Sequence, residues 1–233
     1  MSIEEGIGIK HTNSWHQSYK LITKIIHDNG LHSDNPLIYL NFGRDYYGKR
    51  KHVLNRKVEH ISDKIRMNQL FDKYKIPHPK TYYYPFRDLP DCGDSCVIKQ
   101  RYGRGKGRGV VFLNFNEIHR KALHNNMYVQ DYIPFEKEYR VVNFIGNFRC
   151  REKIGNSKIK NSDTCRYRNH RDSPLERFAK QVCYKFKIDF AGLDIGIYKK
   201  KMMMIEINSA CGLNENSAHT LYHFLREYYE SVR

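Results

Sequence analysis

Residues 192–213 read GLDIGIYKKKMMMIEINSACGL, a pattern of two β-strands joined by a short basic turn. Apolar residues dominate the runs at 191–198 and 202–207, and three lysines at 199–201 separate them. Short apolar runs on either side of a polar turn are typical of a β-hairpin. We therefore expect an antiparallel hairpin over these residues.

Three oxygen-bearing side chains lie on this predicted hairpin. Glu206 and Asn208 are two residues apart and share a face of their strand, while Asp194 lies on the partner strand at the same end of the ladder. Two carboxylates and an amide oxygen are hard ligands suited to Mg²⁺. A strand filled with Met203 and Ile205 would not host an acid without a cation or a metal. The alternative is an exposed face on which these acids pair with the nearby lysines.

A glycine-rich segment lies upstream, where residues 97–110 read VIKQRYGRGKGRGV. We expect a strand that ends in Lys99, then a flexible loop, then a returning strand. Backbone N–H groups of such a loop can close over phosphates while the lysine supplies a point charge. The P-loop pattern GxxxxGK[ST] is absent. The alternative is a basic, RGG-like segment that binds single-stranded nucleic acid.

Two further segments carry weaker signals. Residues 128–133, YVQDYI, form an apolar run whose backbone can face a flat heterocycle, with Glu138 placed to accept hydrogen bonds from ribose hydroxyls; a surface strand is the alternative. Ser62 is a predicted N-cap, and Lys64 follows it at the start of a helix. A lysine there opposes the helix dipole unless an anion such as phosphate is present, or unless solvent screens it.

Strands and helices mix without strict βαβ alternation, which predicts an α+β fold. We expect a short leading lobe at 1–58, a first subdomain with the glycine-rich loop at 59–128 and a second subdomain with the hairpin at 129–233. The expected helices are 14–28, one from Ser62 to about 75, 116–125, 173–186 and 218–229. The expected strands are 37–40, 81–84, 96–99, 110–113, 128–133, 138–145, 148–153, 191–198 and 202–207.

The composition is strongly basic, with 41 Lys and Arg against 25 Asp and Glu, a formal charge of +16. Such a field attracts nucleic acid, nucleotides or acidic peptides, or it reflects a biased composition with solvated charges. The 6 cysteines are scattered, which favours a reducing, cytoplasmic location. No apolar run approaches the length of about 18 residues that crosses a bilayer, so no membrane association is expected.

Four segments, taken in order, resemble the ATP-grasp superfamily, nearest its ribosomal-protein glutamate ligase branch. They are VLNRKVEHISDKIRMNQLFDKYKIPHPKT at 53–81, VIKQRYGRGKGRGV at 97–110, VQDYIPFEKEYRV at 129–141 and GLDIGIYKKKMMMIEINSACGL at 192–213. The likeness covers about two-thirds of the chain. It implies two α+β subdomains that clamp ATP, preceded by a short N-terminal lobe. Gly192 departs from the pattern, because D-alanine ligases carry an arginine there.

The resemblance also implies a role for each matched residue. Those expected at the nucleotide phosphates are Lys64, Lys99, Arg101, Gly103, Gly105 and Gly107. Those expected around the adenine and ribose are Gln130, Asp131, Tyr132, Ile133 and Glu138. One or two Mg²⁺ ions would be held by Asp194, Glu206 and Asn208. Arg140, Lys153 and Arg151 would face the phosphates and an acyl-phosphate.

The implied activity is an ATP- and Mg²⁺-dependent ligase that joins a carboxylate to an amine or thiol through an acyl-phosphate. The basic charge adds an acidic peptide and nucleic acid as candidate partners. Two alternatives stay open. An ATP-grasp site can phosphorylate a hydroxyl, and the basic residues can belong to a nucleic-acid-binding module without catalysis.

Overall fold

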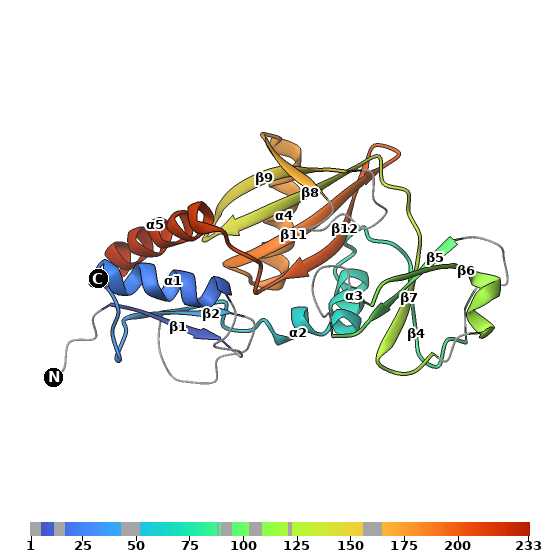
Figure 1. The fold of residues 1–233 in the computed structure, drawn as a ribbon, viewed down its shortest axis with the longest axis horizontal. Coiled ribbons are helices and arrows are strands. Elements are labelled where there is room, and N and C mark those ends of the chain that lie inside the picture. Colours follow the sequence, from blue (N-terminus) through green and yellow to red (C-terminus); the bar gives the residue numbers. More distant parts are fainter. Residues whose placement is uncertain are drawn as a thin grey trace.

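The structure is a computed structural model that describes residues 6–11, 17–42, 52–87, 89, 95–102, 109–120, 123–155 and 165–233. Within them, helices and three β-sheets are arranged along the long axis of the molecule (Figure 1). The predicted α+β class is confirmed. No helix in these ranges is long and apolar enough to cross a membrane.

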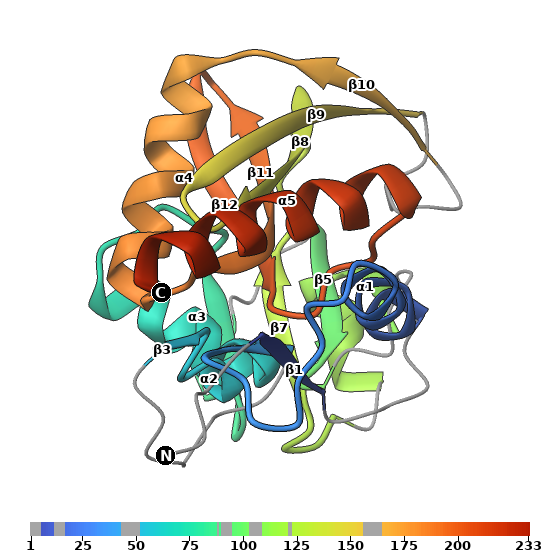
Figure 2. The ribbon, with the colours of Figure 1, turned by 90° about the vertical axis from the view of Figure 1, so that its left-hand side faces the viewer.

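A three-stranded parallel sheet forms one end of the molecule. It contains β1 (Ile7–His11), β2 (Ile38–Phe42) and β3 (His52–Leu54) in that order. Helix α1 (Gln17–Asp28) and the C-terminal helix α5 (Glu215–Val232) lie beside it (Figure 2).

The two helices of this end share one core. Ile22 and Ile26 of α1 are buried in the same cluster as Leu221 and Leu225 of α5. Helix α5 therefore contributes to the core of the leading lobe. Of the helix predicted at 14–28, residues 14–16 lie outside the described ranges.

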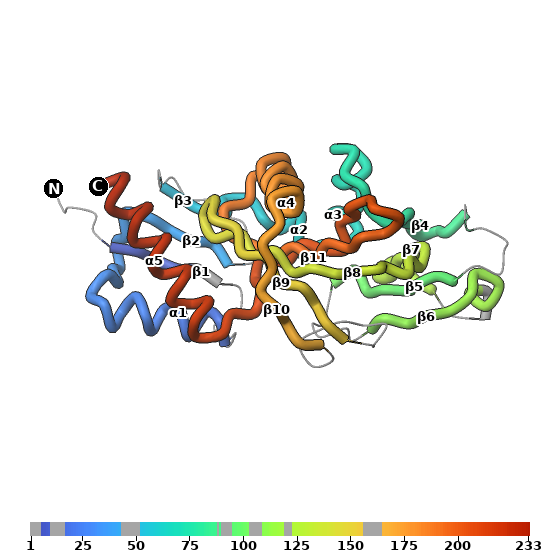
Figure 3. Tube along the Cα trace, turned by 90° about the horizontal axis from the view of Figure 1, so that it is seen from above, coloured from blue at the N-terminus to red at the C-terminus, as the bar shows by residue number. Residues whose placement is uncertain are grey.

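A four-stranded antiparallel sheet forms the opposite end (Figure 3). Its order is β4 (Thr81–Tyr83), β7 (Met127–Asp131), β5 (Ser95–Gln100) and β6 (Val111–Asn114). The predicted subdomain boundary between residues 128 and 129 falls inside β7. Of the helix predicted at 116–125, residues 116–120 belong to a short 3-10 helix, η1 (Phe115–Arg120), residues 121–122 lie outside the described ranges, and residues 123–125 are not helical.

A five-stranded antiparallel sheet occupies the middle. The strands are β8 (Lys137–Phe144), β9 (Asn147–Ile154), β10 (Arg166–His170), β11 (Phe190–Tyr198) and β12 (Lys201–Asn208), in the order β10-β9-β8-β11-β12. Helix α4 (Ser173–Phe186) spans the predicted residues, and its N-cap is Asp172. The hairpin predicted from 192–213 is β11 and β12.

Two helices from earlier in the chain also pack on this middle sheet. They are α2 (Glu59–Ser62) and α3 (Lys64–Lys73). Met67 and Phe71 of α3 are fully buried in one cluster with Leu193 and Ile207 of the hairpin. The first residues of the predicted first subdomain are thus integral to the core of the second.

The N-cap of α3 differs from the prediction. Ser62 is the last residue of α2, and Asp63 caps α3. The Asp63 carboxylate accepts hydrogen bonds from the backbone N–H groups of Ile65 at 3.2 Å and Arg66 at 3.3 Å. Serine and aspartate both favour the N-cap position, and here the cap is Asp63 because it directly precedes the first residue of α3.

Candidate active site

A row of charged residues crosses the middle sheet. In the ladder, Arg151 of β9 is opposite Arg140 of β8, which is opposite Asp194 of β11, which is opposite Glu206 of β12. Residues directly opposite in antiparallel strands place their side chains on the same face. Asn208, two residues beyond Glu206, shares that face. The hairpin therefore gathers the three predicted metal ligands, as its sequence pattern indicates.

Lys64 reaches this face from the first turn of α3. Its Nζ lies 2.7 Å from Glu206 Oε1 and donates hydrogen bonds to the Ile207 carbonyl at 2.8 Å and to Asn208 Oδ1 at 3.3 Å. The Lys64 side chain is 9% exposed. A lysine distant in sequence thus meets two of the predicted metal ligands, and β12 supplies the oxygens that balance its charge at the helix N-terminus.

Asp194 is held by two cations from neighbouring strands. Lys153 Nζ lies 2.7 Å from Asp194 Oδ1, and Arg140 Nε lies 2.8 Å from the same oxygen. Arg140 Nη2 donates to Oδ2 at 3.0 Å. Lys153 also lies 4.0 Å from Glu138 Oε2. These four residues form one ionic network at the centre of the sheet.

Asp194 and Glu206 both stay charged at neutral pH. Burial raises the pKa of Asp194, but the charges of Arg140 and Lys153 outweigh it and hold the pKa below its ordinary value. Burial likewise raises the pKa of Glu206, but the charge and hydrogen bond of Lys64, together with the charge of Lys99, hold it below its ordinary value. In both cases burial is the largest single influence on the pKa, and the neighbouring positive charges together offset it.

Lys99 lies on β5 and makes a different contact. Its Nζ donates to the side-chain oxygen of Gln130 at 2.7 Å. The Gln130 amide in turn donates to Asn68 Oδ1 at 3.0 Å and to Thr81 Oγ1 at 2.9 Å. Burial lowers the pKa of Lys99, and the charge of Glu206 opposes that shift. Lys99 therefore shares the electrostatic environment of the site while it contacts a neutral partner.

The residues expected around adenine continue from Gln130. The Asp131 carboxylate accepts a hydrogen bond from the Tyr82 hydroxyl at 3.1 Å, and Tyr132 N–H donates to the Ser95 carbonyl at 3.0 Å. The Ile133 carbonyl accepts from Phe135 N–H at 2.9 Å. The segment is ordered by these contacts, and its part in an adenine hinge stays a prediction.

Arg101 contacts protein rather than the row of charges. Its guanidinium bonds the carboxylate of Asp63, with a shortest distance of 2.6 Å. Sequence reasoning gave no signal for this pair. Gly103, Gly105 and Gly107 lie in residues 103–108, outside the described ranges.

The donor set fits Mg²⁺ by its chemistry. In the described part of the chain, no group of three or more His, Cys, Asp or Glu side chains is arranged to hold a metal. The candidate donors are the two opposite carboxylates, Asp194 and Glu206, with the amide oxygen of Asn208 beside them. Hard oxygen donors of mixed charge suit Mg²⁺, which completes its shell with water and phosphate oxygens.

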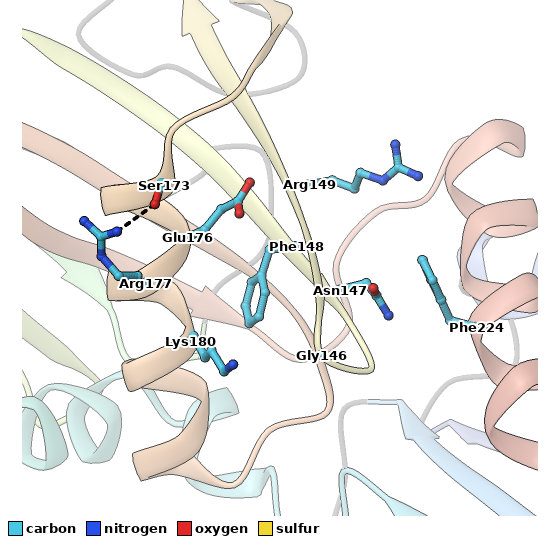
Figure 4. Close-up of a pocket in the computed structure, with 9 residues that line it drawn as sticks. All are labelled: Gly146, Asn147, Phe148, Arg149, Ser173, Glu176, Arg177, Lys180 and Phe224. Atoms are coloured by element: carbon cyan, nitrogen blue, oxygen red, sulfur yellow. Dashed lines mark hydrogen bonds between the residues drawn. The ribbon is translucent and has the colours of Figure 1, made fainter. Parts of the chain in front are cut away.

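A cavity of about 560 Å³ lies away from this site, between α4, the β8–β9 turn and α5 (Figure 4). Its lining residues are Gly146, Asn147, Phe148, Arg149, Ser173, Glu176, Arg177, Lys180 and Phe224. None of the predicted site residues is among them. Three separate segments build it, so no local pattern indicated it.

No family model and no curated protein matches the sequence. Solved structures do match. A RimK-domain ATP-grasp protein from Sphaerobacter thermophilus has a TM-score of 0.66 at 12% identity, covering 94% of this chain and 98% of that one. The ATP-grasp ligase PsnB, solved with a variant of its precursor, Mg and ADP, has 0.67 at 9%, covering 95% and 99%. D-alanine–D-alanine ligase from Bacillus anthracis has 0.64 at 12%, covering 98% of each chain.

Proposed function

We propose, from the premise that this chain has the ATP-grasp fold, that it is an ATP- and Mg²⁺-dependent ligase. It would join a carboxylate to an amine or a thiol through an acyl-phosphate. The fold alone does not specify a reaction, so the proposal depends on the site.

One observation carries the proposal. Lys64 of α3, Asp194 of β11 and Glu206 of β12 belong to separate elements and converge on one face of the middle sheet. Lys99 of the four-stranded sheet is linked to α3 through hydrogen bonds from Lys99 to Gln130 and from Gln130 to Asn68. Paired acids surrounded by lysines suit a polyphosphate held with a divalent cation.

The chemistry follows from that arrangement. The substrate carboxylate attacks the γ-phosphorus of ATP, the bond to the bridging oxygen breaks, and ADP leaves. An amine or thiol then attacks the acyl carbon and displaces phosphate. Lys64 and Lys99 would neutralise the ATP phosphates, while Arg140 and Lys153 stabilise charge on the transferred group.

Asp194, Glu206 and Asn208 would hold one or two Mg²⁺ ions, which neutralise phosphate charge and orient it for transfer. Arg151 lies opposite Arg140 and would add positive charge on the same face of the sheet. Residues 130–133 would line the adenine and Glu138 would accept from the ribose. Arg101 and the loop glycines at 103, 105 and 107 would lie over the phosphates.

An acidic peptide is the substrate class that charge favours. PsnB and the macrocyclase MdnC were solved with precursor peptides. Here the cavity of Figure 4 offers Arg149, Arg177 and Lys180 against the single acid Glu176, with Phe148 extending between β9 and α4. An extended acidic segment with an apolar residue would match these groups.

The location that suits this chemistry is the cytoplasm. Among the described cysteines, Cys150, Cys183 and Cys211 are buried free thiols. Free, mostly buried thiols are typical of proteins in a reducing compartment.

The decisive experiment measures ADP release with a panel of amino acids and acidic peptides. Wild type and Glu206→Ala are compared side by side, and products are analysed by mass. An amide or thioester that depends on Glu206 supports the ligase, whereas a phosphorylated hydroxyl supports a kinase. Salt-sensitive oligonucleotide binding, without Mg²⁺-dependent stabilisation by an ATP analogue, would support the non-catalytic module.

A further inference from the structure

The ammonium group of Lys64 sits among three oxygens of one strand. Glu206 Oε1, the Ile207 carbonyl and Asn208 Oδ1 surround it at 2.7, 2.8 and 3.3 Å. An ammonium has three N–H donors, and each of these oxygens can accept one. The position is therefore a complete cation site made by β12, occupied by a side chain of the same protein.

The site is fixed from both sides. Lys64 is the first residue of α3, and the cap on Asp63 sets where that helix begins. Met67, one turn further, is fully buried, and its sulfur lies 3.4 Å from the Ile207 backbone nitrogen. Packing of α3 against β12 thus holds the Lys64 ammonium at these oxygens.

The other two lysines of the site make different contacts. Lys99 donates to the neutral amide oxygen of Gln130, and Lys153 contacts Asp194. Among the described residues, Lys64 is the cation in contact with Glu206. Of these three lysines, Lys64 is therefore the one that contacts two of the oxygen donors proposed for Mg²⁺, those of Glu206 and Asn208.

An ammonium and Mg²⁺ cannot share these oxygens. Magnesium requires oxygens at about 2.0–2.1 Å, and a lysine nitrogen at hydrogen-bond distance from them occupies the same space. Like charges at such a separation repel strongly in a buried site. Free Mg²⁺ would have to displace Lys64 and leave its buried ammonium without an acceptor, which is strongly unfavourable.

We propose that Lys64 is a resident counter-ion that excludes free Mg²⁺ from Glu206 and Asn208 until a polyphosphate gives its ammonium another anionic partner. This inference rests on the proposed function, because it concerns the same nucleotide site. Metal and polyphosphate then bind with positive coupling, and by linkage each strengthens the other equally. The contact with Lys64 keeps the Glu206 carboxylate charged and oriented when no metal is bound.

The test uses Mn²⁺ alone as the probe, because free and bound Mn²⁺ are counted directly by electron paramagnetic resonance. Lys64→Met keeps most of the side-chain volume and removes the charge. We expect its affinity for Mn²⁺, without nucleotide, to exceed that of wild type at least tenfold. Thermal unfolding in Mg²⁺ alone is the second readout, with the melting temperature raised in Lys64→Met and unchanged in wild type.

Lys99→Met is the matched control. It makes the same change at a partly buried lysine of the same site, but at one that contacts a neutral amide. We expect it to bind Mn²⁺ no more tightly than wild type. Adding Glu206→Ala to Lys64→Met should abolish the gained binding, which locates the metal at these oxygens.

Two results would overturn the inference. One is equal binding of Mn²⁺ alone by wild type and Lys64→Met, and the other is an equal gain in Lys99→Met. If Lys64→Met does not fold, Lys64→Gln replaces it, since the amide still donates to the Ile207 carbonyl. Wild type gives an independent check, because Glu206-dependent binding of Mn²⁺ alone would contradict the inference without any lysine variant. If Lys64→Met binds Mn²⁺ more tightly as expected but the protein shows no ATP-dependent ligation, only the proposed function is contradicted.

Discussion

Arg101 bonds both carboxylate oxygens of Asp63, with Nε 3.0 Å from each oxygen and Nη2 2.6 Å from one of them. The Arg101 carbonyl also accepts from Lys64 N–H at 3.0 Å. Arg101 follows β5 and precedes the glycine-rich segment, while Asp63 caps α3. This pair therefore fastens the four-stranded sheet to the helix that carries Lys64.

Arg101→Met should lower the free energy of unfolding by about 1 kcal/mol, because a bidentate but partly exposed ion pair is lost. Asp63→Ala should lower it by about 2 kcal/mol, since the N-cap of α3 is lost as well. Urea unfolding measures both values. Arg226→Met breaks the exposed Arg226–Glu230 pair and serves as a control with no measurable change expected. An Arg101→Met protein as stable as wild type would show that the Arg101–Asp63 ion pair does not contribute to the stability of the fold.

Gly192 leaves the space that Arg140 fills. A Cβ built on Gly192 would lie 2.6 Å from Arg140 Nη1 and 2.9 Å from the Cβ of Cys211. Gly192→Ala should therefore displace the guanidinium from Asp194 and cost about 2 kcal/mol of stability through overpacking. In the ligation assay we expect kcat to fall at least tenfold, with a smaller change in the KM for ATP.

Arg140→Lys supplies the check on this reading of Gly192. Lysine ends in a single nitrogen that can move away from the new Cβ, so the Gly192→Ala/Arg140→Lys protein should lose less than the two single changes combined. Strict additivity would mean that Gly192 acts independently of Arg140. Gly212→Ala is the control glycine, since its added Cβ would meet no atom within 4 Å.

Asn55 joins the leading lobe to β11 through its side chain. Its Oδ1 accepts from Asp189 N–H at 2.9 Å and Phe190 N–H at 3.0 Å, and its Nδ2 donates to the Asn41 and Phe190 carbonyls. The residue is fully buried with a positive φ of 53°. These bonds give Asn55 a structural role.

Asn55→Ala should lower the free energy of unfolding by about 3 kcal/mol, because several buried groups lose their partners at once and the left-handed backbone disfavours alanine. Guanidinium unfolding measures the loss. Asn29→Ala removes one partly buried bond, to the Ile25 carbonyl, and should have a much smaller effect. Equal effects at the two positions would contradict the account of Asn55.

The parts of the fold that sequence predicted well depend on local signals. Helix α4 has an apolar stripe, a proline near its start and an acidic N-cap, and the hairpin of β11 and β12 closes over a three-lysine turn. Strands β1, β3 and β10 were not predicted. Strands β1 and β3 pair with β2 in parallel, which needs a longer connection than a hairpin turn, and β10 is a mostly exposed edge strand beside β9, so it has no apolar pattern.

In the candidate site, too, local sequence patterns predicted some residues, whereas contacts between distant residues were not predictable. Asp194, Glu206 and Asn208 come together because one hairpin carries them, and side-chain alternation places them on one face. The contact of Lys64 with Glu206 spans two subdomains, and only the order of the motifs suggested it. The Lys99–Gln130 bond and the Asp63–Arg101 pair join residues far apart in sequence, where neither periodicity nor spacing carries information.

Acid should weaken the fold through Asp194. Its folded pKa lies below the ordinary 3.8, so the folded state binds this proton less readily than the unfolded chain does. The stability that Asp194 contributes is therefore complete above about pH 5 and is lost as the pH falls through the folded value. Asp194→Asn leaves Arg140 and Lys153 without their carboxylate, and at about pH 7 it should lower the free energy of unfolding by about 3 kcal/mol.

The difference in the free energy of unfolding between wild type and Asp194→Asn should depend on pH. Once the pH falls below the folded pKa of Asp194 and the wild-type carboxyl is protonated, Asp194→Asn and wild type should approach equal stability, because both then present a neutral side chain to the same two cations. Urea unfolding at several pH values follows the difference. Asp28→Asn removes an exposed carboxylate and should track wild type throughout. A deficit in Asp194→Asn that persists unchanged at low pH would mean that lost packing, and not the lost charge, causes it.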